Sequence, residues 1–229
     1  MGSALRWRAV RTDPMYAMIY ADAASLALEQ SSVQTYYFTK TIGDLFVSSK
    51  SAPTRKMFTE ISCLDDIWAF LEVEFLSSLY NTDAPSNVDE VAMVYYNNKL
   101  LGQPRLRMLK VRNDSCAVVQ SFAREITECY SNYKPSVEDK ATFGPGNTEA
   151  YIWRSGEELM TEKIYGTIAV YGAGGYLLRL PLDNKSEAAD LIAGVKANRW
   201  IDRGSRAVMI DFTMFNANVN LFSIARYSS

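Results

Sequence analysis

The chain of 229 residues contains no histidine. Without an imidazole it cannot build the Ser-His-Asp or Cys-His nucleophile systems, nor a zinc site with histidine ligands. Its three cysteines include no CxxC pair, which argues against a thiolate zinc site. Adjacent carboxylates such as Asp65 and Asp66 point apart on a helix, and no EF-hand spacing occurs. We therefore predict no catalytic residue, no metal site and no cofactor, and a protein that is not an enzyme.

The sequence also lacks an excess of one charge sign and a long apolar run. Its 24 Lys and Arg against 26 Asp and Glu leave a formal net charge of −2, which does not favour a nucleic acid partner. A membrane-spanning helix needs roughly 20 mostly apolar residues. The best candidate, 16–28, is interrupted by Asp22, so we predict a helix there that stays out of bilayers. With 48% hydrophobic residues, the chain has enough apolar side chains for one large domain.

Apolar residues recur at helical spacing over 64–80. This pattern places Leu64, Trp68, Leu71 and Phe75 on one face of a helix, where we expect them to be buried. A strand over 206–215 is apolar at both odd and even positions, as is typical of a central strand. We predict that the helix face shares one core with three residues of that strand: Val208, Ile210 and Phe212.

Further apolar segments predict additional helices and strands. Short helices are expected from 122 to 130 and from Ser186, as its N-cap, to about 199. Strands are expected over 91–97, 104–112, 166–171 and 176–180, the first two joined by a turn containing Gly102. Because helices and strands mix without a strict βαβ order, we predict an α+β fold. Its antiparallel sheet is covered by helices on one face, with long loops and a projecting hairpin.

The projecting hairpin is predicted around a small-residue segment made of Gly172, Ala173, Gly174 and Gly175. A phosphate-binding loop of this composition would need a helix to follow it. The next residues, from Tyr176, read as a strand instead. The segment is therefore predicted to be the turn that joins the strands over 166–171 and 176–180.

Cysteines and sequons supply candidate modification sites. Cys116 and Cys129 bracket a short segment, and the residues alone leave open a disulfide or two buried free thiols. Cys63 has no obvious mate, and we expect it to face the core as a free thiol. Asn113 and Asn184 each begin an Asn-x-Ser sequon and are candidate glycosylation sites. For Asn184 the alternative is that the serine of its sequon caps a helix.

Basic residues concentrate in two places, along the strand over 104–112 and in the turn before the strand over 206–215. They could bind an anion, or their side chains could pair with acids inside the fold or at an interface. The resemblance of this stretch to a structural strand of a known family, described below, favours the structural role. The residues predicted to act structurally, together with the helix tryptophan, are Arg105, Arg107, Arg203, Arg206 and Trp68.

Two stretches about a hundred residues apart, 102–116 (GQPRLRMLKVRNDSC) and 200–222 (WIDRGSRAVMIDFTMFNANVNLF), carry a resemblance to a known family. They resemble the extracellular domain of polycystin-2-like cation channels, which belong to the TRP superfamily. Shorter stretches agree in the same order: 36–40 (YYFTK), 143–145 (FGP), 165–169 (YGTIA) and 171–176 (YGAGGY). The resemblance covers roughly residues 35–226.

The resemblance implies a domain organisation, since the family's domain lies between the first and second transmembrane helices. Residues 1–34 would stand in the place of the first transmembrane helix, although they read as a water-soluble helical segment. Residues 35–217 would form the polycystin extracellular domain. Residues 218–229 would be a tail leading toward a second membrane helix that this chain does not contain, so we expect the chain itself to be soluble.

The resemblance also implies a function and modifications. Cys116 and Cys129 match a disulfide pair, and Asn113 lies in a family motif. The domain would be a lid over a calcium-permeable, non-selective cation channel of cilium, plasma membrane or endoplasmic reticulum, on its extracellular or lumenal side. It would mediate gating and assembly as a homotetramer or with a related polycystin subunit, meeting its neighbour through 172–175. The alternatives are a secreted or cell-surface binding module without a channel and, less favoured, an enzyme.

Overall fold

The computed structural model describes residues 5–6, 20–21, 58, 61–80, 93–94, 98–145, 148–166, 168–216 and 221–228. The chain divides into two compact units. The first comprises residues 1–105, 179–195 and 210–229, and the second comprises residues 106–178 and 196–209. Within the described part of the chain, none of the helices has the length and apolar composition needed to cross a bilayer.

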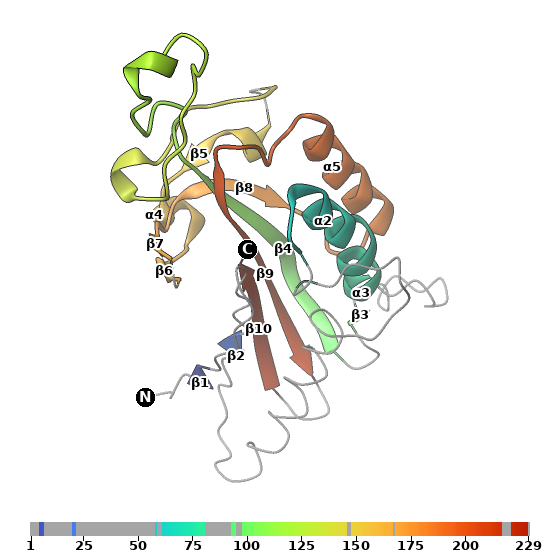
Figure 1. The fold of residues 1–229 in the computed structure, drawn as a ribbon. Helices are drawn as coiled ribbons and strands as arrows, with labels where there is room; N and C mark the ends of the chain where they lie inside the picture. Colours follow the sequence, from blue (N-terminus) through green and yellow to red (C-terminus); the bar gives the residue numbers. More distant parts are fainter. Residues whose placement is uncertain are drawn as a thin grey trace. The chain divides into compact units, whose positions relative to one another are not determined.

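A six-stranded sheet has the strand order β10-β9-β4-β8-β5, with β3 also paired to β4 (Figure 1). Antiparallel registers join β3 to β4 and β5 to β8. The strands are β3 (Met93–Val94), β4 (Asn98–Lys110), β5 (Trp153–Arg154), β8 (Gly175–Arg179), β9 (Ser205–Asn216) and β10 (Leu221–Ser228). The sheet together with its helices confirms the α+β prediction.

In the first unit, one helical segment contains α2 (Leu64–Ala69), η3 (Phe70–Phe75) and α3 (Leu76–Leu79), and its middle part is a π-helix. Its buried face includes Trp68, Leu71 and Phe75, as predicted. The Phe75 ring lies 6.1 Å from the ring of Phe212 on β9, which packs the helix on the sheet. Leu64 is 38% exposed, so its predicted burial was wrong. The packed face begins one turn later, at Trp68.

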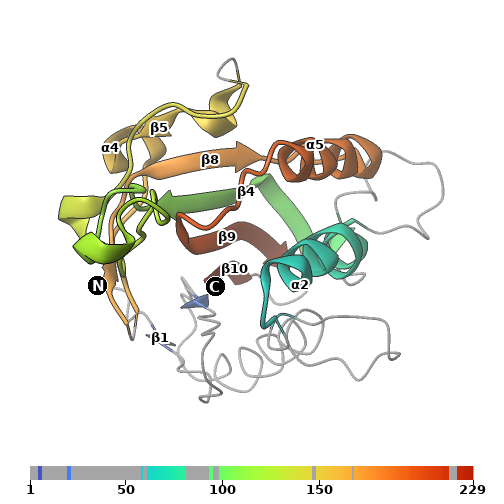
Figure 2. The same ribbon diagram turned by 45° about the horizontal axis from the view of Figure 1, so that its top comes forward.

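Helix α5 (Lys185–Ala197) begins two residues earlier than predicted, since the prediction had Ser186 as its N-cap. The Asn184 side chain accepts the backbone N–H of Glu187 at 3.1 Å, so Asn184, not Ser186, caps the helix. The helix buries Ala188, Ile192 and Val195. Figures 1 and 2 show α2 and α5 on the same side of β4 and β9.

Two further secondary-structure predictions were wrong, one for a turn and one for a helix. Strand β4 runs unbroken from 98 to 110 through Gly102, whose φ of +70° is accommodated inside the strand, so the expected turn at Gly102 does not exist. The helix expected over 16–28 is absent at Tyr20–Ala21, which form β2 and pair with β1 (Leu5–Arg6). The other residues of that segment lie outside the described residues, as does 35–57. The segment 218–229 contains β10, a strand of the sheet.

The second unit has a core of buried residues from β4, β9 and the loops around them: Leu109, Val111, Tyr133, Ile164, Ala207 and Met209. A separate hairpin pairs β6 (Ile164–Tyr165) with β7 (Val170–Tyr171). The helical pieces are η5 (Gln120–Phe122), η6 (Pro135–Val137), η7 (Glu149–Tyr151) and α4 (Gly156–Leu159). The prediction of a helix over 122–130 was therefore wrong: the short helix η5 ends at Phe122, where the predicted helix would begin.

Candidate functional site

The guanidinium of Arg107 is a buried cation in the second unit. Arg107 is 1% exposed, and its Nη1 donates to the carbonyls of Gly172 at 2.7 Å, Ala173 at 3.0 Å and Gly174 at 2.8 Å. The carbonyls of three consecutive residues can face one group only if the chain curls around it. The small-residue segment 172–174 is thus wrapped around the arginine of β4.

The composition of this segment follows from how closely it is packed. A Cβ on Gly174 would lie 2.5 Å from the Trp153 ring and 2.7 Å from the Arg154 carbonyl oxygen, so only glycine fits there. The carbonyl of Ala173 also accepts a hydrogen bond from the Thr161 hydroxyl at 2.5 Å. The segment is therefore fixed by hydrogen bonds from both Arg107 and Thr161 and by close packing on Trp153.

A carboxylate with two aromatic donors supports the same segment. Glu138 accepts hydrogen bonds from the Tyr133 hydroxyl and from the Trp153 indole, both at 2.8 Å. The Tyr133 oxygen in turn accepts the backbone N–H of Gly172 at 2.9 Å. Burial, and next the hydrogen bond to Glu138, raise the pKa of Tyr133, so the phenol stays protonated as the donor. Glu138, Tyr133 and Gly172 lie in loops and Trp153 in β5, far apart in the sequence, and no local sequence pattern pointed to them.

The hairpin predicted around Gly172 to Gly175 is wrong. Strand β7 pairs with β6, and β8 pairs with β5, so the strands on the two sides of the segment do not pair with each other. The hairpin in the structure is β6–β7, where the Gly166 N–H donates to the Ala169 carbonyl at 3.0 Å. Its turn lies six residues before the predicted one.

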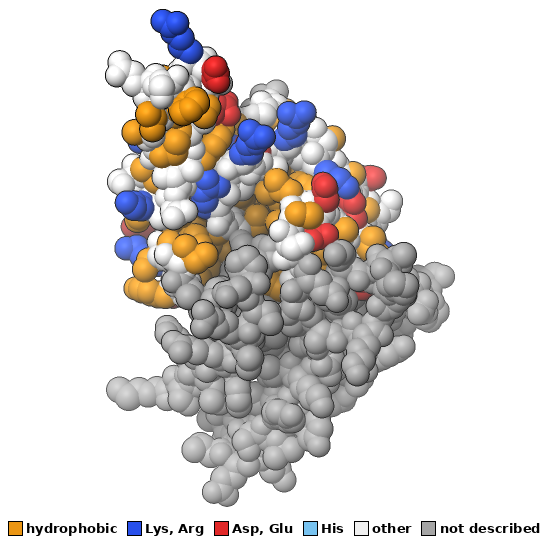
Figure 3. Space-filling model, in the orientation of Figure 1, with side chains coloured by type: hydrophobic (Ala, Val, Ile, Leu, Met, Phe, Trp, Pro, Cys, Tyr) orange, Lys and Arg blue, Asp and Glu red, His pale blue; other side chains and the backbone are white. Residues whose placement is uncertain are grey.

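The β6–β7 hairpin displays apolar side chains to solvent. Tyr165 is 64% exposed, Ile168 is 67% exposed and Val170 is partly exposed. Figure 3 shows apolar side chains gathered over this hairpin and over the region of η5. Exposed apolar patches of this kind are typical of protein interaction surfaces.

A disulfide between Cys116 and Cys129, whose Cα atoms are 5.2 Å apart, closes the loop that contains η5. Within this loop Val119, Phe122 and Ile126 are exposed. The crosslink is reinforced by the Cys129 N–H, which donates to the Asn113 carbonyl at 2.7 Å. The loop therefore presents apolar side chains on a constrained backbone.

The third cysteine, Cys63, is an exposed free thiol, so the prediction that it faces the core was wrong.

The two sequon asparagines have different surroundings. Asn113 is exposed, and no described residue forms a hydrogen bond with its side chain. The Asn184 amide is engaged at the start of α5, with Oδ1 accepting from Glu187 N–H and Nδ2 donating to the Glu187 carboxylate at 3.3 Å. Asn113 is thus the more available of the two.

The remaining predicted basic residues make structural contacts. Arg206 donates from Nε to the Ser131 carbonyl and from Nη1 to the carbonyls of Arg203 and Ser205, each at 2.8 Å. Arg203 itself is exposed and contributes that backbone carbonyl. In the first unit, a guanidinium nitrogen of Arg105 lies 4.0 Å from the Asp211 carboxylate, which also pairs with Arg226 at 2.5 Å.

Lys110 is buried and pairs with Asp202 at 2.7 Å, while its ammonium lies 4.0 Å from the centre of the Phe143 ring. The Asp202 carboxylate also accepts the Gly204 N–H at 2.8 Å. An Asp two residues before a Gly is typical of such a turn, and this signal could have found Asp202. Among the described residues, no group of Cys, Asp and Glu side chains is arranged to hold a metal ion.

The described part of the second unit thus combines a disulfide-closed loop, an exposed apolar hairpin and a buried arginine bonded to backbone carbonyls. Residues 57–228 match the polycystin domain family. The chain is 46% identical over 211 residues to polycystin-2 of Caenorhabditis elegans, covering 92% of this chain and 30% of that protein. It is 38% identical over 216 residues to human polycystin-2-like protein 1, covering 93% of this chain and 27% of that protein.

A third relative, polycystin-2 of Danio rerio, is 40% identical over 204 residues, which are 85% of this chain and 22% of that protein. The chain belongs to the polycystin family, as the resemblance in the sequence indicated. It spans about a third or less of the length of these relatives.

Proposed function

We propose that this chain is the extracellular or lumenal domain of a polycystin-2-like channel subunit, and that it holds neighbouring subunits together above a cation pore. The observation that carries this proposal is the β6–β7 hairpin, which exposes Tyr165, Ile168 and Val170. A closed ring of identical subunits needs a heterologous contact, in which one patch meets a different patch on the next copy. An apolar hairpin is suited to such a contact.

The sequence predicted that the segment 172–175 contacts the neighbouring subunit, and we now propose the β6–β7 hairpin for that contact instead. Gly172, Ala173 and Gly174 turn their carbonyls to Arg107, and Gly174 and Gly175 are buried. Their role in our proposal is to fix the base of the hairpin, which ends at Tyr171, one residue before Gly172. The disulfide-closed loop with Val119, Phe122 and Ile126 is the proposed second contact surface.

The proposal extends to the parent protein. It is a calcium-permeable, non-selective cation channel of cilium, plasma membrane or endoplasmic reticulum, assembled as a homotetramer or with a related polycystin subunit. The lid couples external events to the gate. Asn113 carries an N-linked glycan, because its exposed amide is available and the disulfide suits an oxidising compartment. Asn184 is a second glycosylation site that is less favoured.

The experiment introduces Tyr165→Ser and Ile168→Ser together into the full-length channel and measures assembly by crosslinking and by native mass. We expect the tetramer fraction and the whole-cell current to fall, while the isolated domain keeps its melting temperature. The matched control is Val73→Ser, which removes an exposed apolar side chain from the first unit and should leave assembly unchanged. Intact tetramers and normal current in the double variant would overturn the hairpin contact.

The isolated chain is a weaker test. Membrane helices raise the effective concentration of tethered domains, so an interface that closes in the full-length protein can be too weak to form in solution. A monomer at micromolar concentration is therefore compatible with the proposal. A twofold dimer that buries the β6–β7 hairpin on its axis is not, because that arrangement does not close a ring of four.

A further inference from the structure

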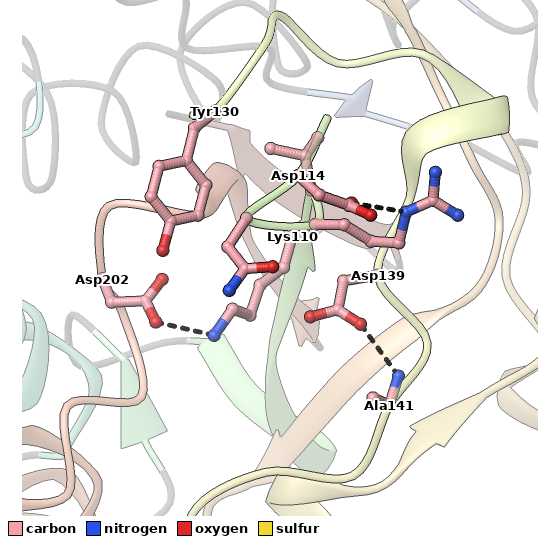
Figure 4. Close-up of a pocket in the computed structure, with 9 residues that line it drawn as sticks. Lys110, Asp114, Tyr130, Asp139, Ala141 and Asp202 are labelled. Carbon is pink, nitrogen blue, oxygen red and sulfur yellow. Dashed lines mark hydrogen bonds and ion pairs between the residues drawn. The ribbon is translucent and has the colours of Figure 1, made fainter. Parts of the chain in front are cut away.

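A polar pocket lies in the second unit, next to the end of β4. It has a volume of about 370 Å³ and is lined by Lys110, Val111, Arg112, Asn113, Asp114, Tyr130, Asp139, Ala141 and Asp202. This volume is at the small end of the range for ligand pockets, which is roughly 300–1,000 Å³. Figure 4 shows the side chains of Tyr130, Lys110 and Asp202 directed toward one another across it. The lining is mostly charged or polar, so an apolar ligand does not suit it.

Some groups of the lining are already satisfied, and others keep hydrogen-bonding capacity. Lys110 and Asp202 neutralise each other at 2.7 Å. Asp139 uses Oδ1 to accept the Ala141 N–H at 3.0 Å, and no described residue donates to its Oδ2. The Tyr130 hydroxyl donates a hydrogen bond to the Glu128 carboxylate at 3.0 Å, and its oxygen can still accept a hydrogen bond.

The pocket also contains an unused donor. Arg112 contacts the Asp114 carboxylate through Nε at 3.2 Å, and its two Nη groups have no partner among the described residues. The pocket therefore offers carboxylate, phenol and guanidinium groups side by side. A sugar ring presents hydroxyl donors, an acetamide carbonyl and an apolar face, so an amino sugar is complementary to this set.

The position of Asn113 selects which sugar reaches the pocket. Asn113 is itself a lining residue, and its amide makes no hydrogen bond to a described residue. A glycan joined to Asn113 starts at this amide nitrogen, so its first residue lies at the pocket entrance and the later ones extend from it. We infer that the first N-acetylglucosamine of a glycan on Asn113 occupies this pocket. The inference rests on the proposed glycosylation of Asn113.

In this arrangement the sugar completes the fold rather than only covering it. Arg112 donates a hydrogen bond to the acetamide carbonyl, while Asp139 and Tyr130 accept hydrogen bonds from sugar hydroxyls. The modification thereby connects the end of β4 to the loop that carries Tyr130 and to the loop that carries Asp139. Stabilisation should depend on the first sugar alone, because the outer residues of the glycan do not reach the pocket.

The test uses the chain secreted from a eukaryotic cell line with Asn184→Gln, so that a single sequon remains. Three forms are compared by mass and by thermal melting: the full glycan, the glycan trimmed by an endoglycosidase to one N-acetylglucosamine, and Asn113→Gln. We expect the trimmed form to melt about 2–4 °C above Asn113→Gln and together with the full glycan. The difference should vanish with Tyr130→Ala and persist with Tyr165→Ala, which removes an exposed tyrosine elsewhere in the unit.

The outcomes separate the two proposals. If mass analysis finds no sugar on Asn113, the glycosylation proposal is overturned and this inference with it. If the sugar is present but the trimmed form melts with Asn113→Gln, only the pocket inference fails. A crystal structure of the trimmed form with the sugar ring outside the pocket would also overturn it, while density between Tyr130 and Asp139 would establish it.

Discussion

Replacing Arg107 by methionine tests the account of the second unit most directly. Methionine keeps much of the side-chain volume but removes the donor to Gly172, Ala173 and Gly174. All three carbonyls lose the arginine donor, but the Ala173 carbonyl keeps its bond from Thr161, so the loss falls mainly on the carbonyls of Gly172 and Gly174. Each orphaned group costs about 1–3 kcal/mol, so the variant should lose about 2–6 kcal/mol of unfolding free energy. For a chain of this size that lowers Tm by roughly 4–24 °C.

The assay is denaturant unfolding combined with hydrogen exchange. We expect exchange at Gly172, whose N–H is bonded to Tyr133, to accelerate in Arg107→Met, because the segment is no longer held by the arginine. The control is Arg112→Met on the same stretch of chain, where an exposed ion pair with Asp114 contributes about 0–1 kcal/mol. A loss below about 1 kcal/mol for Arg107→Met, with unchanged exchange at Gly172, would refute the reasoning.

Three further predictions concern stability. Cys116→Ser removes the crosslink to Cys129, which has a sequence separation of 13, and should cost about 3 kcal/mol in urea unfolding; an unchanged midpoint would argue against it. Trp68→Ala should cost about 3–5 kcal/mol, whereas Leu64→Ala should cost under about 1 kcal/mol; equal losses would contradict the assigned helix face. Burial first, then the nearby carboxylates, raise the pKa of Tyr176. A raised folded-state pKa stabilises the protein below the unfolded value of about 10, and this contribution is lost as pH rises further. Alkaline melts should therefore show a shallower loss above about pH 10 in Tyr176→Phe, and identical slopes would contradict this.

The sequence predicted those parts of the fold whose pattern is local. The spacing of Trp68, Leu71 and Phe75 gave one helix face, because each turn of a packed helix must present an apolar side chain to the sheet. The continuous apolar run of β9 predicted a strand buried on both faces. Leu64 has the same spacing but lies one turn before the packed surface, and periodicity cannot locate where a neighbouring element ends.

The segment 172–175 shows why the candidate site was predicted only in part. Glycines between two strand patterns are typical of a hairpin turn, and the same residues are needed where backbone curls tightly around a cation. The difference lies in Arg107, about 65 positions earlier, and in the pairing of β7 with β6. Neither is visible in the local pattern. Arg107 was predicted to be structural, but its partners were expected to be acids rather than carbonyls.

The contact of Arg107 with 172–174 also has a consequence for the order in which the chain folds during synthesis. Strand β4 leaves the ribosome long before the three carbonyls, which follow 65 to 67 residues later. A guanidinium is costly to bury without its acceptors, so it should stay hydrated until they arrive. We expect the second unit to close late, in a step that waits for one long-range contact. Until then the two strands that flank β4 in the sheet, β8 and β9, have not been synthesised. At this stage the unpaired edges of β4 can pair with the wrong strand.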